Sequence, residues 1–449
     1  MPQSFADLRL EEAWLPFEPS SDRPFDRRLA AHLYRRAGFA ANTRELDEAV
    51  RLGPQQTVKR LLTAGEASAP FDAEMSRFAQ TTLAANNPEL LSSWWLHRMR
   101  HTPAPLVEKM TLFWHGHFAT SAAKVRKGQL MLAQNELLRR HALGSFAELA
   151  RGIARDPAML LYLDSATNRK NHPNENFARE VMELFCLGLG KYTERDIQEL
   201  ARCFTGWEIQ QDAFKFYSYQ HDYGTKTVLG KSGPFDGDDG LAVILDQPAT
   251  AEFVCGKLVR FFITEDEELP PAWIAPLAQR FRDEQLKAAP VLEMMLTSRL
   301  FYSSAAVGRK VRSPVELGVG LLRSLDSTTN MVQLAQSLRE LGQMVLFPPN
   351  VKGWGGGKHW IDSSTLLARA NLVRRLAAGA QPAGLQRLLI GKSSGEAVGL
   401  LAELLLAAAP PADVRAQLID QLDGIGGNRT RLIQPLVVAL GSLPEFQLS

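Results

Sequence analysis

The segment from residue 175 to residue 183 carries the densest group of side chains suited to catalysis or metal binding. Five of its polar residues would share one face of a helix, in an arc of about 140°: Glu175, Asn176, Arg179, Glu180 and Glu183. Glu180 and Glu183, spaced i,i+3, can share a metal ion, and Glu175 or Glu180 can act as a general acid or base. Arg179 can pair with Glu175 or hold an anionic group of a substrate. A solvated charged face of an amphipathic helix explains the same pattern.

A second candidate is an H-x-H pattern among bulky aromatics, FWHGHF, at residues 113–118. If this segment is extended, the imidazoles of His115 and His117 point to the same side and form a workable pair of ligands for Zn, Cu or Fe. Together with Glu180 and Glu183 they would make a site for a divalent transition metal. Histidines that form hydrogen bonds at a helix end and in the core are the structural alternative.

Further candidates lie outside these two segments. The pair His221-Asp222 is on a loop and can act as a base or a ligand, although a turn stabilised by the aspartate is the commoner explanation. Lys352 is a candidate for holding an anionic or polar substrate group. Trp207 and Trp354 can line a pocket for a sugar or an aromatic ring, and core packing explains them equally well.

The composition limits the class of protein. The 449 residues include 51 Lys and Arg and 49 Asp and Glu, for a net charge of +2, and 45% are hydrophobic. These values indicate a soluble globular chain and exclude extensive disorder. They also argue against a partner attracted by bulk charge, so we expect no nucleic acid. Three cysteines do not make a disulfide framework, and we expect Cys186, Cys203 and Cys255 to be small core residues.

Several familiar signals are missing from the sequence. It has neither a P-loop nor a G-x-G-x-x-G turn after a strand, so we expect no nucleotide cofactor. It has no run of about 18 apolar residues, and we expect no membrane span. The N-terminus as written lacks a signal peptide, which favours the cytoplasm. A trimmed chain would instead be periplasmic or exported.

The elements that must position these residues are mostly helices. Apolar residues recur at helical spacing along most of the chain, and the best helix is expected at 175–187. Short β-like runs interrupt them at about 208–235. We therefore predict a mainly α fold in three parts: an irregular arm at 1–24, a large multi-helical globular domain at 25–380 with a β-containing excursion at 208–240, and a C-terminal helical cap at 381–449.

The same motifs resemble a known family. The segments are LYRRAGFAA, EKMTLFWHGHFATS, RDPAMLLYLD, PNENFAREVMELFCLGLGKYTERDIQELARCFTGW, HDYGTKTVLG, RSPVEL and LFPPNVKGWGGGKHWIDSSTLLARAN. In this order, over roughly residues 28–375, the chain resembles the bacterial family called domain of unknown function 1800. The family pattern usually reads LFTLG where this chain has Cys186. The resemblance implies a bacterial protein, often exported and commonly encoded beside a sulfatase-like family that is a candidate protein partner.

Three functional hypotheses follow from these residues. The first is a metal-dependent, hydrolase-like enzyme with a His/carboxylate site in a helical scaffold. The second is a non-catalytic scaffold or partner protein whose polar motifs are structural. The third is a metal-free enzyme that uses two carboxylates as acid and base on a saccharide, which depends on the separation of those carboxylates in the fold.

Overall fold

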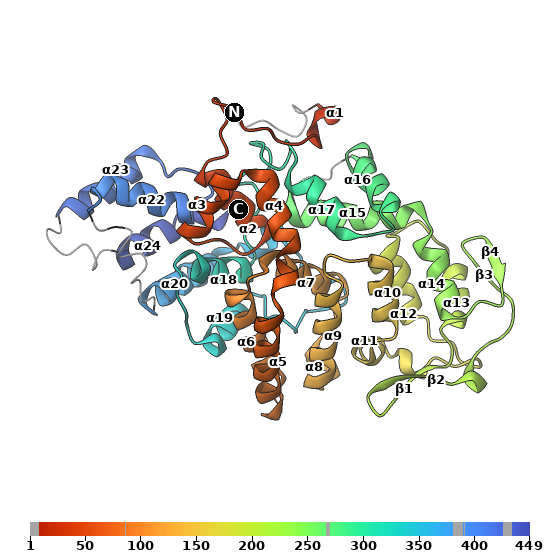
Figure 1. Cartoon of the computed structure of the whole chain (residues 1–449). Helices are drawn as coiled ribbons and strands as arrows, with labels where there is room; N and C mark the ends of the chain where they lie inside the picture. Colours follow the sequence, from red (N-terminus) through yellow and green to blue (C-terminus); the bar gives the residue numbers. More distant parts are fainter. Residues whose placement is uncertain (1–8, 86, 266–269, 380–388, 390, 425–432) are drawn as a thin grey trace.

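The computed structural model describes residues 9–85, 87–265, 270–379, 389, 391–424 and 433–449. The fold is mainly α, as predicted, with two small antiparallel hairpins. Figure 1 shows the hairpins at one end of the molecule and the C-terminal helices at the other, with α7 between them. Within the described residues, no helix is both long and apolar enough to cross a membrane.

The first part of the chain is a run of helices, most of which start at a proline or a capping residue. They are α1 (Leu10–Ala13), α2 (Arg27–Ala37), α3 (Thr43–Leu52), α4 (Pro54–Thr63), α5 (Ala69–Ala84), α6 (Pro88–His101), α7 (Pro105–His117), α8 (Ala122–Val125), α9 (Gly128–Arg140), α10 (Phe146–Ala154) and α11 (Pro157–Tyr162). Asn42 and Glu45 form a capping box at the start of α3. Pro105 occupies the first turn of α7, where its missing N–H costs nothing.

The helix expected at 175–187 has two parts. It begins as the α-helix α12 (Asn176–Glu180) and continues as a π-helix, Val181–Cys186. The N–H of Leu187 donates to the carbonyl of Met182, five residues back, at 2.9 Å.

The β-containing excursion forms where the sequence predicts it. It follows α13 (Glu194–Cys203) and consists of β1 (Trp207–Gln210), β2 (Ala213–Phe216), β3 (Lys226–Val228) and β4 (Lys231–Gly233). β1 pairs with β2 and β3 pairs with β4, both antiparallel. Each hairpin has only two strands, so its stability depends on packing against the helices around it.

The remaining helices include α18, which is fully buried and packs against α6, α19, α20 and α22. They are α14 (Gly237–Leu245), α15 (Pro248–Phe262), α16 (Pro271–Asp283), α17 (Ala288–Leu296), α18 (Pro314–Ser324), α19 (Met331–Glu340), α20 (Ser363–Gly379), α22 (Ser394–Leu405), α23 (Ala412–Gly424), α24 (Ile433–Gly441) and α25 (Pro444–Gln447). All residues of α18 are buried. Ser313 caps it and exchanges hydrogen bonds with Glu316, a capping box that the S-x-x-E spacing encodes.

Both ends of the chain pack on this helical body. Pro16 pairs with Ser298 in an isolated bridge, and Phe17 is buried, so the described part of the N-terminal arm is held in place. At the other end, α22 contacts α2 and α18, and Arg312 donates to the carbonyl of Leu405 at 2.8 Å. The boundary at residue 380 stays a prediction, and residues 1–8 of the arm lie outside the described residues.

The core is one hydrophobic cluster that runs through the described helices. Trp94 and Trp95 of α6 and Trp114 of α7 are among its largest fully buried side chains. The three cysteines are free and buried, as predicted. Burial raises the pKa of the Cys186 thiol to about 12, so this residue is a packing group rather than a nucleophile.

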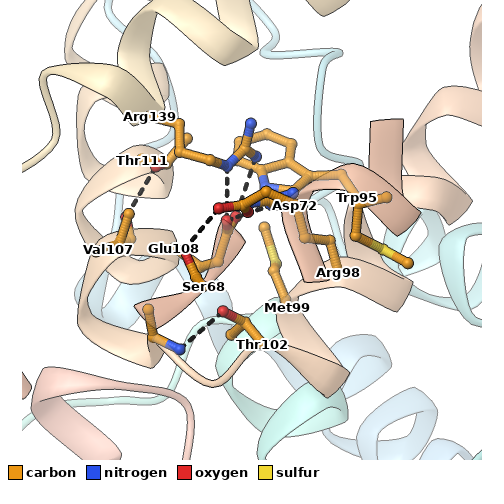
Figure 2. Close-up of polar contacts among 12 residues, drawn as sticks. Ser68, Asp72, Trp95, Arg98, Met99, Thr102, Val107, Glu108, Thr111 and Arg139 are labelled. Carbon is orange, nitrogen blue, oxygen red and sulfur yellow. Dashed lines mark hydrogen bonds and ion pairs between the residues drawn. The ribbon is translucent and has the colours of Figure 1, made fainter. Parts of the chain in front are cut away.

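One carboxylate, Glu108, joins three helices inside this core (Figure 2). Its Oε1 accepts from Nε of Arg98 and from Nε of Arg139, both at 2.6 Å, and its Oε2 accepts from Nε1 of Trp95 at 2.9 Å. Arg98 also pairs with Asp72 of α5. Burial alone would raise the pKa of Glu108, but Arg139 and Arg98 outweigh it and lower that pKa to about 2. The negative charge of Glu108 is thus balanced by Arg98 and Arg139, and both of its oxygens accept hydrogen bonds.

Candidate functional site

A cavity of about 410 Å³ lies where the C-terminal turn of α7, the second half of α15 and the loop at 347–360 meet. This volume is within the range typical of small-molecule sites. Its wall combines aromatic side chains with charged ones. We call it the α7–α15 pocket and define it by Phe113, His117, Lys257, Lys310, Lys352 and Trp354.

His117, the last residue of α7, is held in one tautomer. Its Nε2 lies 2.9 Å from the carbonyl oxygen of Phe185, which can only accept, so Nε2 carries the proton. The lone pair on Nδ1 therefore faces Nζ of Lys257, 3.3 Å away. Burial lowers the pKa of His117 well below its ordinary value, and Lys257 lowers it further, so the imidazole is neutral.

Lys257 is a half-buried lysine of α15 in the wall of the pocket. Its Nζ donates to the carbonyl of Leu184 at 2.7 Å and to Nδ1 of His117. Among the residues that the structure describes, it forms no ion pair with a carboxylate. Burial lowers the pKa of Lys257 to about 8, and the positive charge of Arg260 contributes to this lowering.

The π-helix supplies the carbonyls that hold these two side chains. The last carbonyls of any helix lack partners within the helix. Here Leu184 and Phe185 fill that position, and Lys257 and His117 satisfy their carbonyl oxygens. The negative end of the helix also favours a cation at this place. A π-helix is rare and is frequent at functional sites, which agrees with its position beside the pocket.

The floor of the pocket is a closed ion network. Nζ of Lys310 lies 2.9 Å from Oε1 of Glu265 and 3.7 Å from Oε2 of Glu316, and Lys109 pairs with the other oxygen of Glu316. Burial alone would raise the pKa of Glu316, but Lys109 and Lys310 reverse this and hold that pKa far below its ordinary value. Each charge in this network therefore has an opposite charge beside it.

The loop at 347–360 forms another wall of the pocket and depends on a glycine. Gly353 has a φ of +78°, and a Cβ atom built there would lie 2.4 Å from the carbonyl oxygen of Gly116. Only glycine permits both this backbone conformation and this close approach to α7. Lys352 and Trp354, on either side of Gly353, both line the pocket. The glycine thus fixes where a cation and an aromatic ring are presented.

Positive charge is in excess over the lining of the pocket. The charged lining residues are four cations and two carboxylates: Lys257, Arg260, Lys310, Lys352, Glu265 and Glu316. Both carboxylates are engaged by buried lysines. Lys257 and Lys352 therefore offer positive charge that no carboxylate of the floor neutralises. A small anion with an apolar or aromatic portion matches this arrangement.

Sequence comparison identifies the family to which this chain is related. The family described as "Protein of unknown function (DUF1800)" matches residues 32–448. The chain belongs to this family. The match confirms the resemblance seen in the motifs and extends past residue 375 through the C-terminal helices, where no motif was recognised. No curated protein and no solved structure matches the chain.

In this DUF1800 protein, three of the residues singled out from the sequence meet in the pocket: His117, Lys352 and Trp354. His115 is not among the residues that line the pocket. Its Nε2 accepts from the N–H of Leu346 at 3.1 Å, and its ring lies 5.5 Å from the ring of Trp354. His115 therefore connects α7 to the loop that forms the pocket wall.

The expected metal geometry is not present among the described residues of this family member. The expected metal pair depended on an extended segment, but α7 continues through His117, so the two side chains leave the helix about 160° apart. The lone pair of His115 Nε2 is engaged by Leu346, and that of His117 Nδ1 faces an amine. No three His, Cys, Asp or Glu side chains are grouped as metal ligands in the described part of the chain. His115 and His117 thus do not present their lone pairs to one common metal ion.

The polar arc at 175–183 is only partly solvated. Arg179 lies 2.7 Å from Glu194 and 3.2 Å from Glu175, so it holds carboxylates of the chain itself. Glu183 accepts a hydrogen bond from Tyr192 at 3.3 Å. Burial, and then Glu183, raise the pKa of Glu180, while Lys352 opposes this rise. Glu180 is thus the member of the arc that interacts with a charge of the pocket.

The candidates of the β-containing excursion do not line the pocket. His221 is buried, and its Nδ1 donates to the carbonyl of Thr205 at 2.9 Å. Asp222 forms an ion pair with Arg202 at 2.7 Å. Trp207 is buried under the guanidinium of Arg155. Each of these side chains has a partner within the excursion or beside it, and the structure does not bring them to His117.

Sequence reasoning missed the residues that give the pocket its charge. Lys257 stands among apolar residues in the sequence, Lys310 lies in the basic run RKVR, and Glu316 is part of the RSPVEL motif. A lone lysine in an apolar helix usually keeps its ammonium in water, so the pattern gives no reason to single it out. The available signal was the capping box of Ser313 and Glu316, which marks a helix start but not a binding site.

Proposed function

We propose that this protein binds a small organic anion in the α7–α15 pocket and acts on it as an enzyme, through proton transfer at Lys257 and His117. The observation that carries the proposal is the ammonium of Lys257, which lines a cavity of small-molecule size and has no carboxylate partner among the described residues. An uncompensated half-buried charge is costly, and a bound anion would offset that cost.

The lining suggests how such a ligand would lie. Its anionic group would meet the positive charge of Lys257 and Lys352, and its apolar portion would lie against Phe113, Phe261 and Trp354. Lysine binds carboxylate and phosphate as a point charge, so both groups suit the site. The matched ion network of the floor would stay in place, because its charges are already neutralised.

The chemistry would use the two side chains that touch each other. With its pKa lowered to about 8, Lys257 exchanges a proton near physiological pH. The Nδ1 atom of His117 is the acceptor for that proton, because the Phe185 carbonyl fixes the tautomer. Glu180, which interacts with Lys352, would be a further acid–base group beside the pocket. The metal-dependent form of this enzyme has less support, because a cation would have to displace or neutralise the ammonium of Lys257.

The experiment measures binding of benzoate, phenyl phosphate and the neutral benzyl alcohol to the purified chain by calorimetry. We expect the two anions to bind and the alcohol to bind at least about tenfold more weakly, a difference of about 1.4 kcal/mol. Lys257→Met should lower the affinity for the anions by about tenfold or more. Lys59→Met, which removes an exposed ammonium of α4 outside the pocket lining, is the matched control.

Two outcomes would contradict the proposal. One is that neither anion binds to the folded wild-type chain, which would favour the non-catalytic scaffold. The other is that Lys257→Met, with an unchanged thermal unfolding profile, binds both anions as tightly as the wild type. The Lys59→Met control guards against a general effect of net charge, because it removes the same charge elsewhere.

A further inference from the structure

The lysines around the α7–α15 pocket fall into two kinds. Lys109 and Lys310 are buried ammonium groups in ion pairs with Glu316 and Glu265. Lys257 instead meets a carbonyl oxygen and a neutral imidazole, and its Nζ lies 4.8 Å from the ring centroid of Phe253. An ion pair stabilises the charged form of a lysine, whereas this environment does so weakly. Burial lowers the pKa of Lys109 to about 8 as well, but Lys109 is fully buried against Glu316 and is not a lining residue of the pocket. Of these three, Lys257 is thus the amine best placed to react.

The neutral form of Lys257 is accessible. Burial lowers its pKa to about 8, so about a tenth of the amine is unprotonated at pH 7. For an ordinary lysine that fraction is lower by on the order of a hundredfold. The neutral amine is the nucleophile in lysine chemistry, and desolvation in an apolar wall beside another cation is a known way to produce it. Here the other cation is Arg260.

We propose that Lys257 forms an imine with the carbonyl carbon of a 2-oxo acid bound in the α7–α15 pocket; this inference rests on the proposed function above. The juxtaposition that carries it is an amine in the α15 wall, a proton acceptor 3.3 Å from that amine, and the positive charge of Lys352 in the loop wall for the carboxylate. A 2-oxo acid places a carbonyl next to a carboxylate, as this arrangement requires.

The step balances without an oxidant or a reductant. The ammonium of Lys257 passes one proton to Nδ1 of His117, and the lone pair of Nζ forms the C–N bond. One proton of the attacking nitrogen passes to the carbonyl oxygen and gives the neutral carbinolamine. The imidazolium of His117 returns its proton to the hydroxyl, the C–O bond breaks, and water leaves. Nitrogen keeps its remaining proton as the iminium, so the ammonium and the carbonyl yield an iminium and one water while His117 is neutral again.

The carbonyl of Leu184 gives this step a defined geometry. It accepts from Nζ at 2.7 Å and so fixes the direction from which the amine faces the cavity. Since Leu184 is in the π-helix, the position of the amine depends on the winding of that helix. The aromatic lining would receive the side chain of the oxo acid, so we expect an aryl 2-oxo acid to react better than pyruvate.

The test treats the full chain with benzoylformate or pyruvate in the presence of sodium cyanoborohydride, followed by intact mass and peptide mapping. We expect one reduced adduct per chain, located on Lys257, with benzoylformate reacting faster than pyruvate. Lys257→Arg keeps the charge but cannot form the imine, so it should retain benzoylformate binding by calorimetry and lose the adduct. Lys59→Met should label as the wild type does.

The outcomes separate the two proposals. If wild type binds benzoylformate but gives no adduct, or labels Lys257 no more than exposed lysines, the imine is refuted and anion binding stands. If benzoylformate does not bind at all, both fail. His117→Asn, if it remains folded, should slow adduct formation and shift its pH profile while the final extent of labelling is kept. An unchanged rate and profile would refute the proton-accepting role of His117.

Discussion

The two ends of α7 carry two different kinds of buried charge. Near its first turn, Glu108 receives hydrogen bonds from Arg98, Arg139 and Trp95, so its charge is fully matched (Figure 2). In its last turn, His117 faces Lys257, an ammonium without a carboxylate partner among the described residues. Both regions border cavities of about 400 Å³. Cavity size alone therefore does not distinguish them.

The two regions differ in whether the protein itself supplies a counter-charge for each buried group. At the Glu108 cluster the protein supplies every counter-charge, so the arrangement is complete and serves packing. At the α7–α15 pocket one amine, Lys257, has no carboxylate partner among the described residues, and we propose that a ligand supplies that charge. A matched network indicates a structural role, and an unmatched cation in a cavity indicates a ligand site.

The largest expected effect is on stability, from Glu108→Gln. The substitution removes the buried counter-charge that Arg98 and Arg139 share and leaves them only the partly exposed carboxylates of Asp72 and Glu136. Breaking a buried pair in this way costs about 3–5 kcal/mol of unfolding free energy. Urea unfolding followed by circular dichroism measures it. Glu136→Gln removes a partly exposed partner of the same Arg139 and should cost less than about 1 kcal/mol.

The sign of the pH dependence follows from the same pKa. In the folded chain the pKa of Glu108 is about 2, below its ordinary 4.5, so its contribution to stability is complete above pH 4.5 and is lost as the pH falls toward 2. The difference in unfolding free energy between the wild type and Glu108→Gln should therefore become smaller as the pH falls from 4.5 toward 2. A difference that does not change with pH would contradict the assignment of this pKa to Glu108. A loss of anion binding in the folded variant would show that the Glu108 cluster is not separate from the α7–α15 pocket.

The next effect concerns the pocket wall, through Gly353→Ala. The positive φ and the 2.4 Å approach to Gly116 mean that a Cβ atom must displace the loop from α7. We expect a loss of about 1–3 kcal/mol in stability and weaker binding of benzoate by calorimetry. Gly379→Ala, on α20 with open space around it, is the control. Unchanged binding in Gly353→Ala would show that the loop does not form the site.

A smaller effect is expected from pH on ligand affinity. Because the pKa of Lys257 is lowered to about 8, its charge is complete below that value and is lost as the pH rises through it. Affinity for benzoate should be constant near pH 6 and fall by about tenfold by pH 9. Lys257→Arg should hold its affinity over this range, because the guanidinium stays protonated. The same decline in Lys257→Arg would assign the titration to another group, such as Lys109.

Much of the fold could be predicted from the sequence, because local rules decide it. Pro105 at a helix start and the capping box of Ser313 and Glu316 act within a few residues of the positions that they define. The β-like sequence at 208–235 also forms strands at the predicted place. Local signals of this kind do not require knowledge of which helices meet.

The pocket could be predicted only in part, because distant contacts create it. Lys257 meets Leu184 across 73 positions and His117 across 140. The π-helical winding at Val181–Cys186 is also invisible to an analysis that assumes 100° per residue. The aromatic and histidine motifs indicate α7 and the loop at 347–360. Lys257, which lines the same pocket, carries no signal in the sequence.

The smallest effect tests whether the polar arc belongs with the pocket or with the matched charges. Arg179 is 35% exposed and pairs with Glu175 and Glu194, so Arg179→Met should cost less than about 1 kcal/mol, with most of the effect removed by high salt. Benzoate affinity should stay within about twofold of the wild type, a shift of about 0.4 kcal/mol. Thermal unfolding at two salt concentrations and calorimetry check both values. A tenfold loss of benzoate affinity would instead place Arg179 in the ligand site, as its position on the arc first suggested. The positively charged part of that site would then reach from Lys257 past the π-helix to α12.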